Sequence, residues 1–128
     1  MIVRPATSKD LPAIGDILSA CGLMVDGVNY DEWTGWLLVA ERQGQVIGMI
    51  HVIPAKPYAI VAELGVLPAF QGSRAAYKLI ESAELMLRAN GLTGWAAYVG
   101  ASRNGFHATV ETWGGKNLGS GSMRWRAF

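Results

Sequence analysis

The chain has 128 residues, of which 51% are hydrophobic and 16% are charged, and its 11 basic and 10 acidic side chains almost balance. This composition fits one packed domain, excludes an intrinsically disordered chain and argues against a dedicated nucleic-acid binder. The apolar runs are too short for a transmembrane helix, the first residues do not form a signal peptide and one cysteine cannot cross-link the chain, so we expect one cytoplasmic domain over residues 1–128 without membrane contacts.

The first half of the chain predicts two helices and three strands. Thr7 and Asp10 have the spacing of a capping box ahead of apolar residues that recur at helical intervals. Gly44 lies between two strand-like runs and suits the positive φ of a tight hairpin turn. The expected elements are a strand over 1–4, a helix from Leu11 to about Cys21, a short helix around 30–35, and hairpin strands over 36–41 and 45–53.

The second half predicts three more strands and two more helices. Pro54 and Pro57 bracket a loop, and Asn90-Gly91 is a good C-terminal cap for a long helix. The apolar face of that helix consists of Ala76, Leu79, Ile80, Ala83 and Leu87. The expected elements are strands over 59–67, 94–99 and 122–128, and helices over 74–89 and 104–112.

The loop that joins the strand over 59–67 to the long helix is the most informative segment. Amides in the first turn of a helix have no intrahelical partner and the helix dipole adds positive charge, so this position favours an anion. Small residues let a phosphate approach the backbone, and Arg74 can add a side-chain contact. The alternative is an ordinary strand-to-helix loop with a solvated arginine. The residues of the loop are Gln71, Gly72, Ser73, Arg74, Ala75 and Ala76.

Three segments in this order resemble the GNAT N-acetyltransferase superfamily. They are Val39–Gly48 with the pattern V-A-E-x-x-G-x-V-I-G, Val66-Leu67-Pro68 at a strand end, and Gln71–Ala76 with the pattern Q-G-x-x-x-A. The opening segment Val3–Leu11 is also similar to that family's first strand and helix. The similarity spans residues 2–115, and the loop resembles that of short phage-type or prophage-type members.

This resemblance implies an α+β fold with three layers, α/β/α, around a central mixed and mostly antiparallel sheet. It also implies acetyl-CoA as the acyl donor and a primary amine, of a small molecule or a protein, that attacks the thioester directly. The positions that it assigns to the cofactor are Leu64, Gly65, Val66, Leu67, Gln71, Gly72, Ser73, Arg74, Ala75, Ala76 and Asn104.

The sequence departs from the family pattern at two positions. The phosphate loop of the family usually has glycine where this chain has Arg74. The family also commonly has a tyrosine in its last helix that protonates the leaving thiolate, and here Val110 or Glu111 falls at that position. Tyr98 is the nearest hydroxyl donor that can replace this acid, and the alternative for Tyr98 is a ring in the core.

The end of the strand over 59–67 should align the pantetheine arm, because the arm resembles a peptide and can pair with a strand edge. We expect Gly65 to mark a bulge or a close approach, and the resemblance implies that a bulge amide here polarises the thioester carbonyl, as in family members. The alternative is a glycine that packing requires. Asn104 matches an asparagine that contacts the arm in the family, and it can equally cap the next helix.

Glu63 is the candidate general base, because an alkylammonium must lose a proton before it attacks a thioester. Strand alternation places Glu63, Gly65 and Leu67 on one face. The alternative for Glu63 is a solvated or lysine-paired carboxylate. His51 and His107 are further proton-transfer candidates, although lone histidines are more often structural, and no spacing of His, Cys or acidic residues predicts a metal site.

Three functional hypotheses follow from these patterns. The first is the amine acetyltransferase, in which acidic residues of the 26–32 segment attract a cationic acceptor. The second is a catalytically silent GNAT-like module that binds CoA or a protein partner, favoured by the two departures from the family pattern. The third is a nucleic-acid-binding domain, which rests only on Arg124 and Arg126. The tryptophan-rich final strand could also pair across a homodimer.

Overall fold

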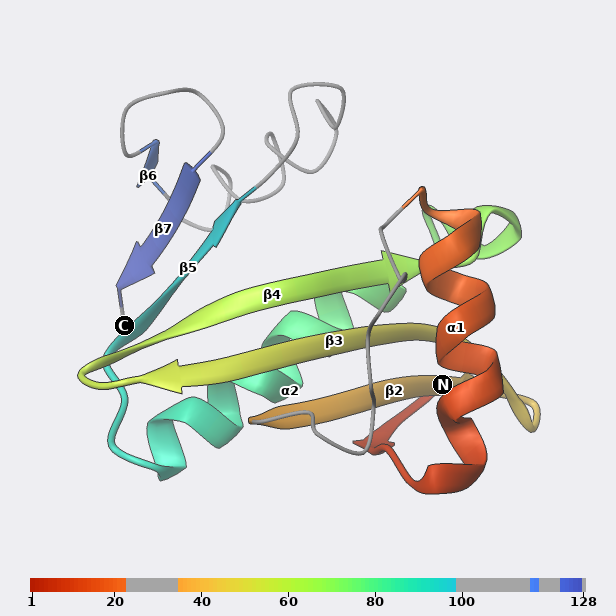
Figure 1. Cartoon of the computed structure of the whole chain (residues 1–128), viewed down its shortest axis with the longest axis horizontal. Coiled ribbons are helices and arrows are strands. Elements are labelled where there is room, and N and C mark those ends of the chain that lie inside the picture. Colours follow the sequence, from red (N-terminus) through yellow and green to blue (C-terminus); the bar gives the residue numbers. More distant parts are fainter. Residues whose placement is uncertain (23–34, 99–115, 118–122, 128) are drawn as a thin grey trace.

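The computed structural model describes residues 1–22, 35–98, 116–117 and 123–127, and within these ranges a single sheet carries a helix on each face (Figure 1). The short helix expected around 30–35 and the helix expected over 104–112 lie outside the described residues. The elements are strands β1 (Ile2–Pro5), β2 (Trp36–Arg42), β3 (Gln45–Ala55), β4 (Tyr58–Val66), β5 (Gly94–Tyr98), β6 (Lys116–Asn117) and β7 (Met123–Ala127), and helices α1 (Leu11–Ala20) and α2 (Ala75–Ala89).

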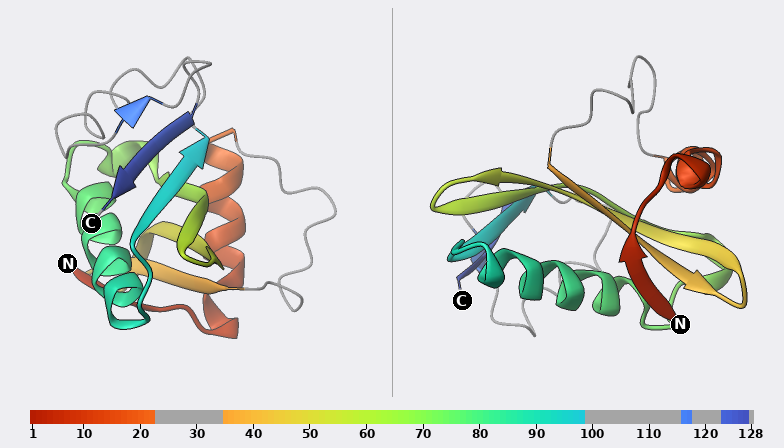
Figure 2. Two further views of the ribbon diagram at one scale, coloured as in Figure 1. Left: turned by 90° about the vertical axis from the view of Figure 1, so that its left-hand side faces the viewer. Right: turned by 90° about the horizontal axis from the view of Figure 1, so that it is seen from below.

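The sheet has seven strands in the order β1-β2-β3-β4-β5-β7-β6. Only β4 and β5 pair in parallel, and every other neighbouring pair is antiparallel. Seen from below, α1 covers one face of the sheet and α2 the other (Figure 2). The expected three-layer α/β/α fold with a mixed, mostly antiparallel sheet is therefore confirmed. Neither described helix is long and apolar enough to span a membrane.

Alternating strand residues supply a separate apolar core to each helix. The core under α1 contains Ile14, Ile17, Leu18, Val39 and Met49. The larger core under α2 includes Leu38, Ile50, Val52, Leu64, Val66, Leu79, Ile80, Leu87 and Trp95. The buried face of α2 begins at Ala75 instead of Ala76, which is only half-buried.

Turn chemistry fixes the ends of the hairpin and of α2. Gln43 and Gly44 have φ values of +51° and +82°, the signature of a two-residue turn whose twist matches the strands. At the end of α2, the Leu92 amide donates to the Leu87 carbonyl at 3.0 Å across Gly91, whose φ is +78°. Both turns form where the sequence predicts them.

The prediction of a loop between Pro54 and Pro57 is wrong. β3 and β4 stay paired until Ala55 lies opposite Tyr58, so only Lys56 and Pro57 form the turn. β2 ends opposite Val52, and β3 therefore has an open edge beyond that residue. A proline without an amide hydrogen is tolerated at such an edge, which is why Pro54 does not stop the strand.

Helix α2 begins after a left-handed residue. Arg74 is its N-cap and has a φ of +70°, in the region that glycine adopts without strain. Arg74 occupies the position where the resembling family usually has glycine. The backbone there keeps a glycine-like conformation although the side chain is arginine.

An ion-pair cluster fastens the start of the chain to the sheet. Both carboxylate oxygens of Asp10 accept hydrogen bonds from the Arg4 guanidinium at 2.8 and 2.9 Å, and Arg4 also contacts Glu41 at 2.8 Å. Asp10 in addition accepts from the Thr7 amide at 2.7 Å, as the capping-box spacing predicts. These donors, with Arg4 first, lower the pKa of the Asp10 carboxyl from 3.8 to about 2.

We predict that Arg74→Gly is more stable than Arg74→Ala by about 1 kcal/mol, because both lose the arginine side chain but only alanine keeps the left-handed strain. Urea denaturation of the two variants measures this difference. Equal stabilities, or a more stable alanine variant, would contradict a strained backbone at this position.

We also predict that the stability contributed by Asp10 is lost at acidic pH. Its pKa is lowered on folding, so the stabilisation is complete above pH 3.8 and is lost as the pH falls toward 2. Asp10→Asn should therefore be less stable at pH 7 and lose less stability between pH 4 and pH 2 than the unaltered protein. Asp16→Asn, on the exposed side of α1, is the control and should keep the slope of the unaltered protein in thermal melts.

Candidate active site

Strands β4 and β5 open into a V (Figure 1). They pair over three residues only, from Ala59 opposite Trp95 to Val61 opposite Ala97. β4 then continues to Val66 while β5 diverges from it. The second half of β4 therefore has β3 on one edge and the mouth of the V on the other.

A β-bulge lies where the V begins. Val61 pairs with Val52 and Glu63 pairs with His51, so Ala62 is an extra residue on β4. The prediction of a bulge at Gly65 is therefore wrong, since Gly65 pairs regularly with Met49. A Cβ at Gly65 would lie 2.9 Å from Cγ2 of Ile17, so the glycine marks a close approach to α1, which supports the alternative that packing requires it.

The backbone of Leu64 and Val66 is directed into the V. The Leu67 amide donates to the Ile47 carbonyl of β3 at 2.8 Å, so the residues that alternate with Leu67 point the other way. Val66 confirms this direction, because its carbonyl accepts from the side chains of Cys21 at 3.3 Å and Gln71 at 3.2 Å. The edge that the sequence assigned to the pantetheine arm thus faces the opening between the strands.

Some backbone amides of the loop after β4 are already hydrogen-bonded within the loop. The amides of Gln71 and Ser73 donate to carbonyls within the loop, those of Pro68 and Phe70. The Ser73 hydroxyl also donates to the Phe70 carbonyl. Toward the start of α2, the amides of Gly72, Arg74, Ala75 and Ala76 donate to no acceptor among the described residues.

The space above these amides is open. Gly72 has a φ of +87°, and a Cβ there would meet nothing within 4 Å. The exposed Arg74 side chain leaves the loop and lies over the Tyr77 ring, 5.2 Å from its centroid. Small side chains and an outward arginine thus leave room for an anionic group at the start of α2.

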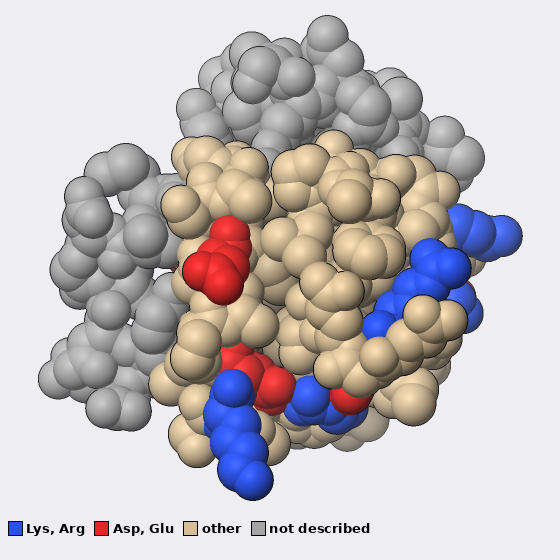
Figure 3. Space-filling view, turned by 90° about the vertical axis from the view of Figure 1, so that its right-hand side faces the viewer, with Lys and Arg blue, Asp and Glu red and all other residues tan. Residues whose placement is uncertain are grey.

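Basic side chains gather along one edge at this end of the sheet. Figure 3 faces this end and shows lysine and arginine side chains mainly along that edge, with aspartate and glutamate side chains toward the middle and the other side. Arg42 of β2 lies over the Phe70 ring of the loop, 6.0 Å from its centroid. A pocket of about 330 Å³ lies between the β2–β3 turn and the loop, lined by Arg42, Gln43, Gln45, Ala69, Phe70, Gln71 and Ser73.

Glu63 and His51 form a pair across β3 and β4. His51 Nδ1 and Glu63 Oε2 are 2.7 Å apart, and the side chains are 8% and 27% exposed. The sequence nominated each residue separately but missed the pair, because their register depends on the bulge at Ala62. Glu63, Gly65 and Leu67 share the α1 face of the sheet, as predicted.

The remaining nominated residues divide between described and undescribed parts of the chain. Tyr98 is the last residue of β5 and follows Ala97, the partner of Val61, so its backbone lies beside the bulge. Asn104, His107 and the acidic residues of the 26–32 segment lie outside the described residues.

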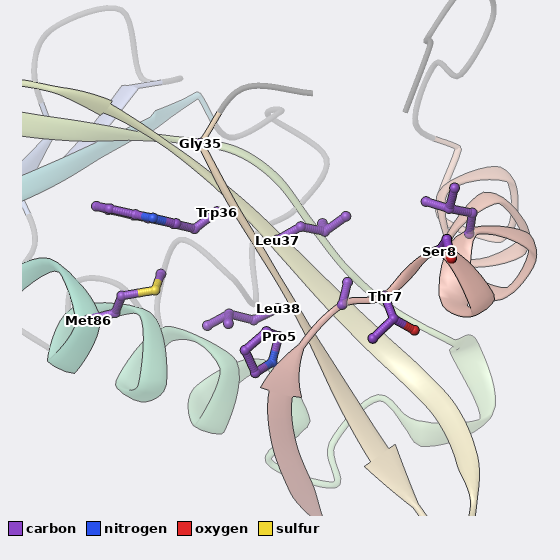
Figure 4. Close-up of a pocket in the computed structure, with 10 residues that line it drawn as sticks. Pro5, Thr7, Ser8, Gly35, Trp36, Leu37, Leu38 and Met86 are labelled. Atoms are coloured by element: carbon purple, nitrogen blue, oxygen red, sulfur yellow. The ribbon is translucent and has the colours of Figure 1, made fainter. Parts of the chain in front are cut away.

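A second pocket, of about 420 Å³, lies near the β1 edge of the sheet, where β1 leaves β2. Figure 4 shows Met86 of α2 directed toward the Trp36 ring of β2, and Leu38 belongs to the same core. Among the described residues, its lining contains no side chain that titrates in the physiological range. Proton transfer is therefore better served by the Glu63 side of the V, two strands away. The lining residues are Pro5, Ala6, Thr7, Ser8, Leu11, Gly35, Trp36, Leu37, Leu38 and Met86.

Solved acetyltransferase structures have the same fold. The PaiA N-acetyltransferase of Thermoplasma acidophilum, in complex with coenzyme A, superposes with a TM-score of 0.82 at 14% identity, covering 99% of this chain and 98% of the other. The ribosomal-protein-alanine N-acetyltransferase of Brucella melitensis gives 0.82 at 17% identity, with 100% of both chains covered. A GNAT family acetyltransferase of Brucella melitensis, in complex with acetyl-CoA, gives 0.76 at 24% identity over 99% and 87%.

Sequence comparison identifies the family. No curated protein matches the chain. The model of the acetyltransferase (GNAT) domain matches residues 33–112, which include the hairpin, the V and the loop before α2. The chain therefore belongs to the GNAT acetyltransferase family.

Proposed function

We propose that this protein transfers an acetyl group from acetyl-CoA directly to a primary amine. The observation that carries this proposal is the continuous path along β4, from the Glu63 carboxylate past the backbone of Leu64 and Val66 to the open amides at the start of α2. Solved proteins of the same fold in complex with coenzyme A and with acetyl-CoA support the choice of donor.

We assign the donor's phosphates to the loop before α2. The amides of Gly72, Arg74, Ala75 and Ala76 would hold them, and the exposed Arg74 guanidinium can add a charge-assisted bond. Gln71 and Ser73 would serve mainly by fixing the loop, because their side chains already bond to Val66 and Phe70 carbonyls. Asn104 is the further contact to the pantetheine arm that the family resemblance implies.

The backbone of β4 would align that arm. Strand residues rise about 3.3 Å each, so Glu63 and Val66 are about 10 Å apart along β4. The Val66 amide, directed into the V, is a donor for the arm, while the Val66 carbonyl is already engaged by Cys21 and Gln71. Leu64 belongs to the same edge, whereas Gly65 and Leu67, which the sequence also assigned to the arm, direct their backbone toward β3 and would hold the strand in register.

Glu63 is the proposed general base. When bound, acetyl-CoA supplies the thioester that the deprotonated amine attacks. The Glu63 carboxylate would accept the proton of the incoming ammonium, directly or through one water. Tyr98 is the proposed acid for the leaving thiolate, because its backbone lies beside the bulge at the base of the V. A thiol with a pKa near 8.5 can also leave without assistance.

We predict that Glu63→Gln lowers turnover about 100-fold or more while the affinity for acetyl-CoA is unchanged, because the amide cannot accept the proton.

We also predict that Arg74→Ala weakens acetyl-CoA binding about tenfold, with Arg88→Ala at the opposite end of α2 as the control of equal charge. Calorimetry measures the affinity. Thiol release with spermidine, an aminoglycoside, an N-terminal alanine peptide and a blocked lysine peptide measures turnover.

Two outcomes would contradict the proposal in different ways. No heat at millimolar acetyl-CoA would exclude the donor site. Saturable binding without thiol release on any of the amines would show instead a silent GNAT-like module.

A further inference from the structure

We propose that His51 is a positioning residue for the Glu63 carboxylate, an inference that rests on the proposed function. The two side chains meet at 2.7 Å, the short distance expected of a hydrogen bond with a charged partner. His51 is the more buried of the two, at 8% exposure against 27% for Glu63. The surrounding protein therefore encloses the histidine more than the glutamate, and the glutamate is the more exposed side chain of the pair.

The surroundings of His51 restrict its motion. His51 lies within β3, opposite Leu37 of β2 and two residues after the fully buried Met49. A free glutamate side chain populates many rotamers, and fixing it in one of them costs conformational entropy. A hydrogen bond from a buried ring offsets part of that cost before any substrate arrives. Preorganisation of this kind brings a base within reach of its proton.

The hydrogen bond also defines the position of the protons. An ionised carboxylate has no hydrogen to donate, so Nδ1 of His51 carries the hydrogen that Oε2 accepts. Oε1 accepts no hydrogen bond from another described residue. In the transfer step the N–H bond of the ammonium breaks and an O–H bond forms at Oε1. The amine becomes neutral, Glu63 becomes a neutral acid, and the proton on Nδ1 stays in place.

The other titratable groups near the pair are few among the described residues. On the α1 face, the strand neighbours of the pair include Leu37, Met49, Ile53 and Gly65, none of which titrates. Cys21, which follows α1 and lies 3.3 Å from the position of a Gly65 Cβ, is the titratable side chain that this end of the helix contributes. His51 is therefore the described residue that is placed to orient the carboxylate.

A double-mutant cycle tests this assignment. His51→Ala should lower kcat/KM for an accepted amine about 10- to 100-fold, as is typical for groups that orient a reacting ligand. In the Glu63→Gln background the same change should cost less than about twofold, because a residue that acts only through Glu63 has nothing left to position. His51→Asn places a donor where Nδ1 lies and should retain activity within about threefold, whereas His51→Gln places its donor where Nε2 lies and should not.

The acetyl-CoA affinity and the melting temperature are measured on every variant. If His51→Ala is unfolded at the assay temperature, the comparison of His51→Asn with His51→Gln decides the question. The assignment is overturned by full activity of the alanine variant, by an equal loss in both backgrounds, or by equal activities of the asparagine and glutamine variants. An unaltered protein that binds acetyl-CoA but acetylates none of the four amines would instead refute the proposed function, and the positioning role with it.

Discussion

One extra residue in β4 sets the geometry of the whole site. Because Ala62 has no partner on β3, the pairing beyond it is shifted by one position, and Glu63 instead of Ala62 lies opposite His51. The parallel pairing with β5 ends at Val61, immediately before the bulge. The opening of the sheet and the placement of its carboxylate therefore begin at the same point in the chain.

The two ends of the V are built by different physical means. At the inner end, a buried imidazole and a carboxylate meet on the face covered by α1. At the outer end, backbone amides and the dipole of α2 provide positive potential without a dedicated buried charge. The strand between them is rigid, since Leu64 and Val66 are buried in the core under α2. A rigid strand keeps the distance between a base and a phosphate site constant.

Sequence patterns predicted the parts of this arrangement that depend on neighbouring residues. Gly44 and Gly91 define turns locally, and the amide-rich start of α2 follows from small residues after a strand. The bulge leaves no such local trace, because Ala62 is as compatible with a regular strand as with a bulge. Without it, the pairing of His51 with Glu63 could not be derived. Arg74 was a second difficulty, since arginine gives no sign of a left-handed backbone.

The exposure of Ala62 has a consequence for how this strand can evolve. Its methyl group faces solvent, so many side chains would be accommodated there at little cost. Deleting the residue would leave a regular ladder in which Glu63 still pairs with His51 and Leu64 with Ile50, so every later side chain of β4 would keep its face. The deletion would instead remove the bulge, and with it the local bend and twist that a bulge gives its strand at the point where the pairing with β5 ends. Ala62 therefore matters as an extra unit of backbone, whereas the identity of its side chain is free.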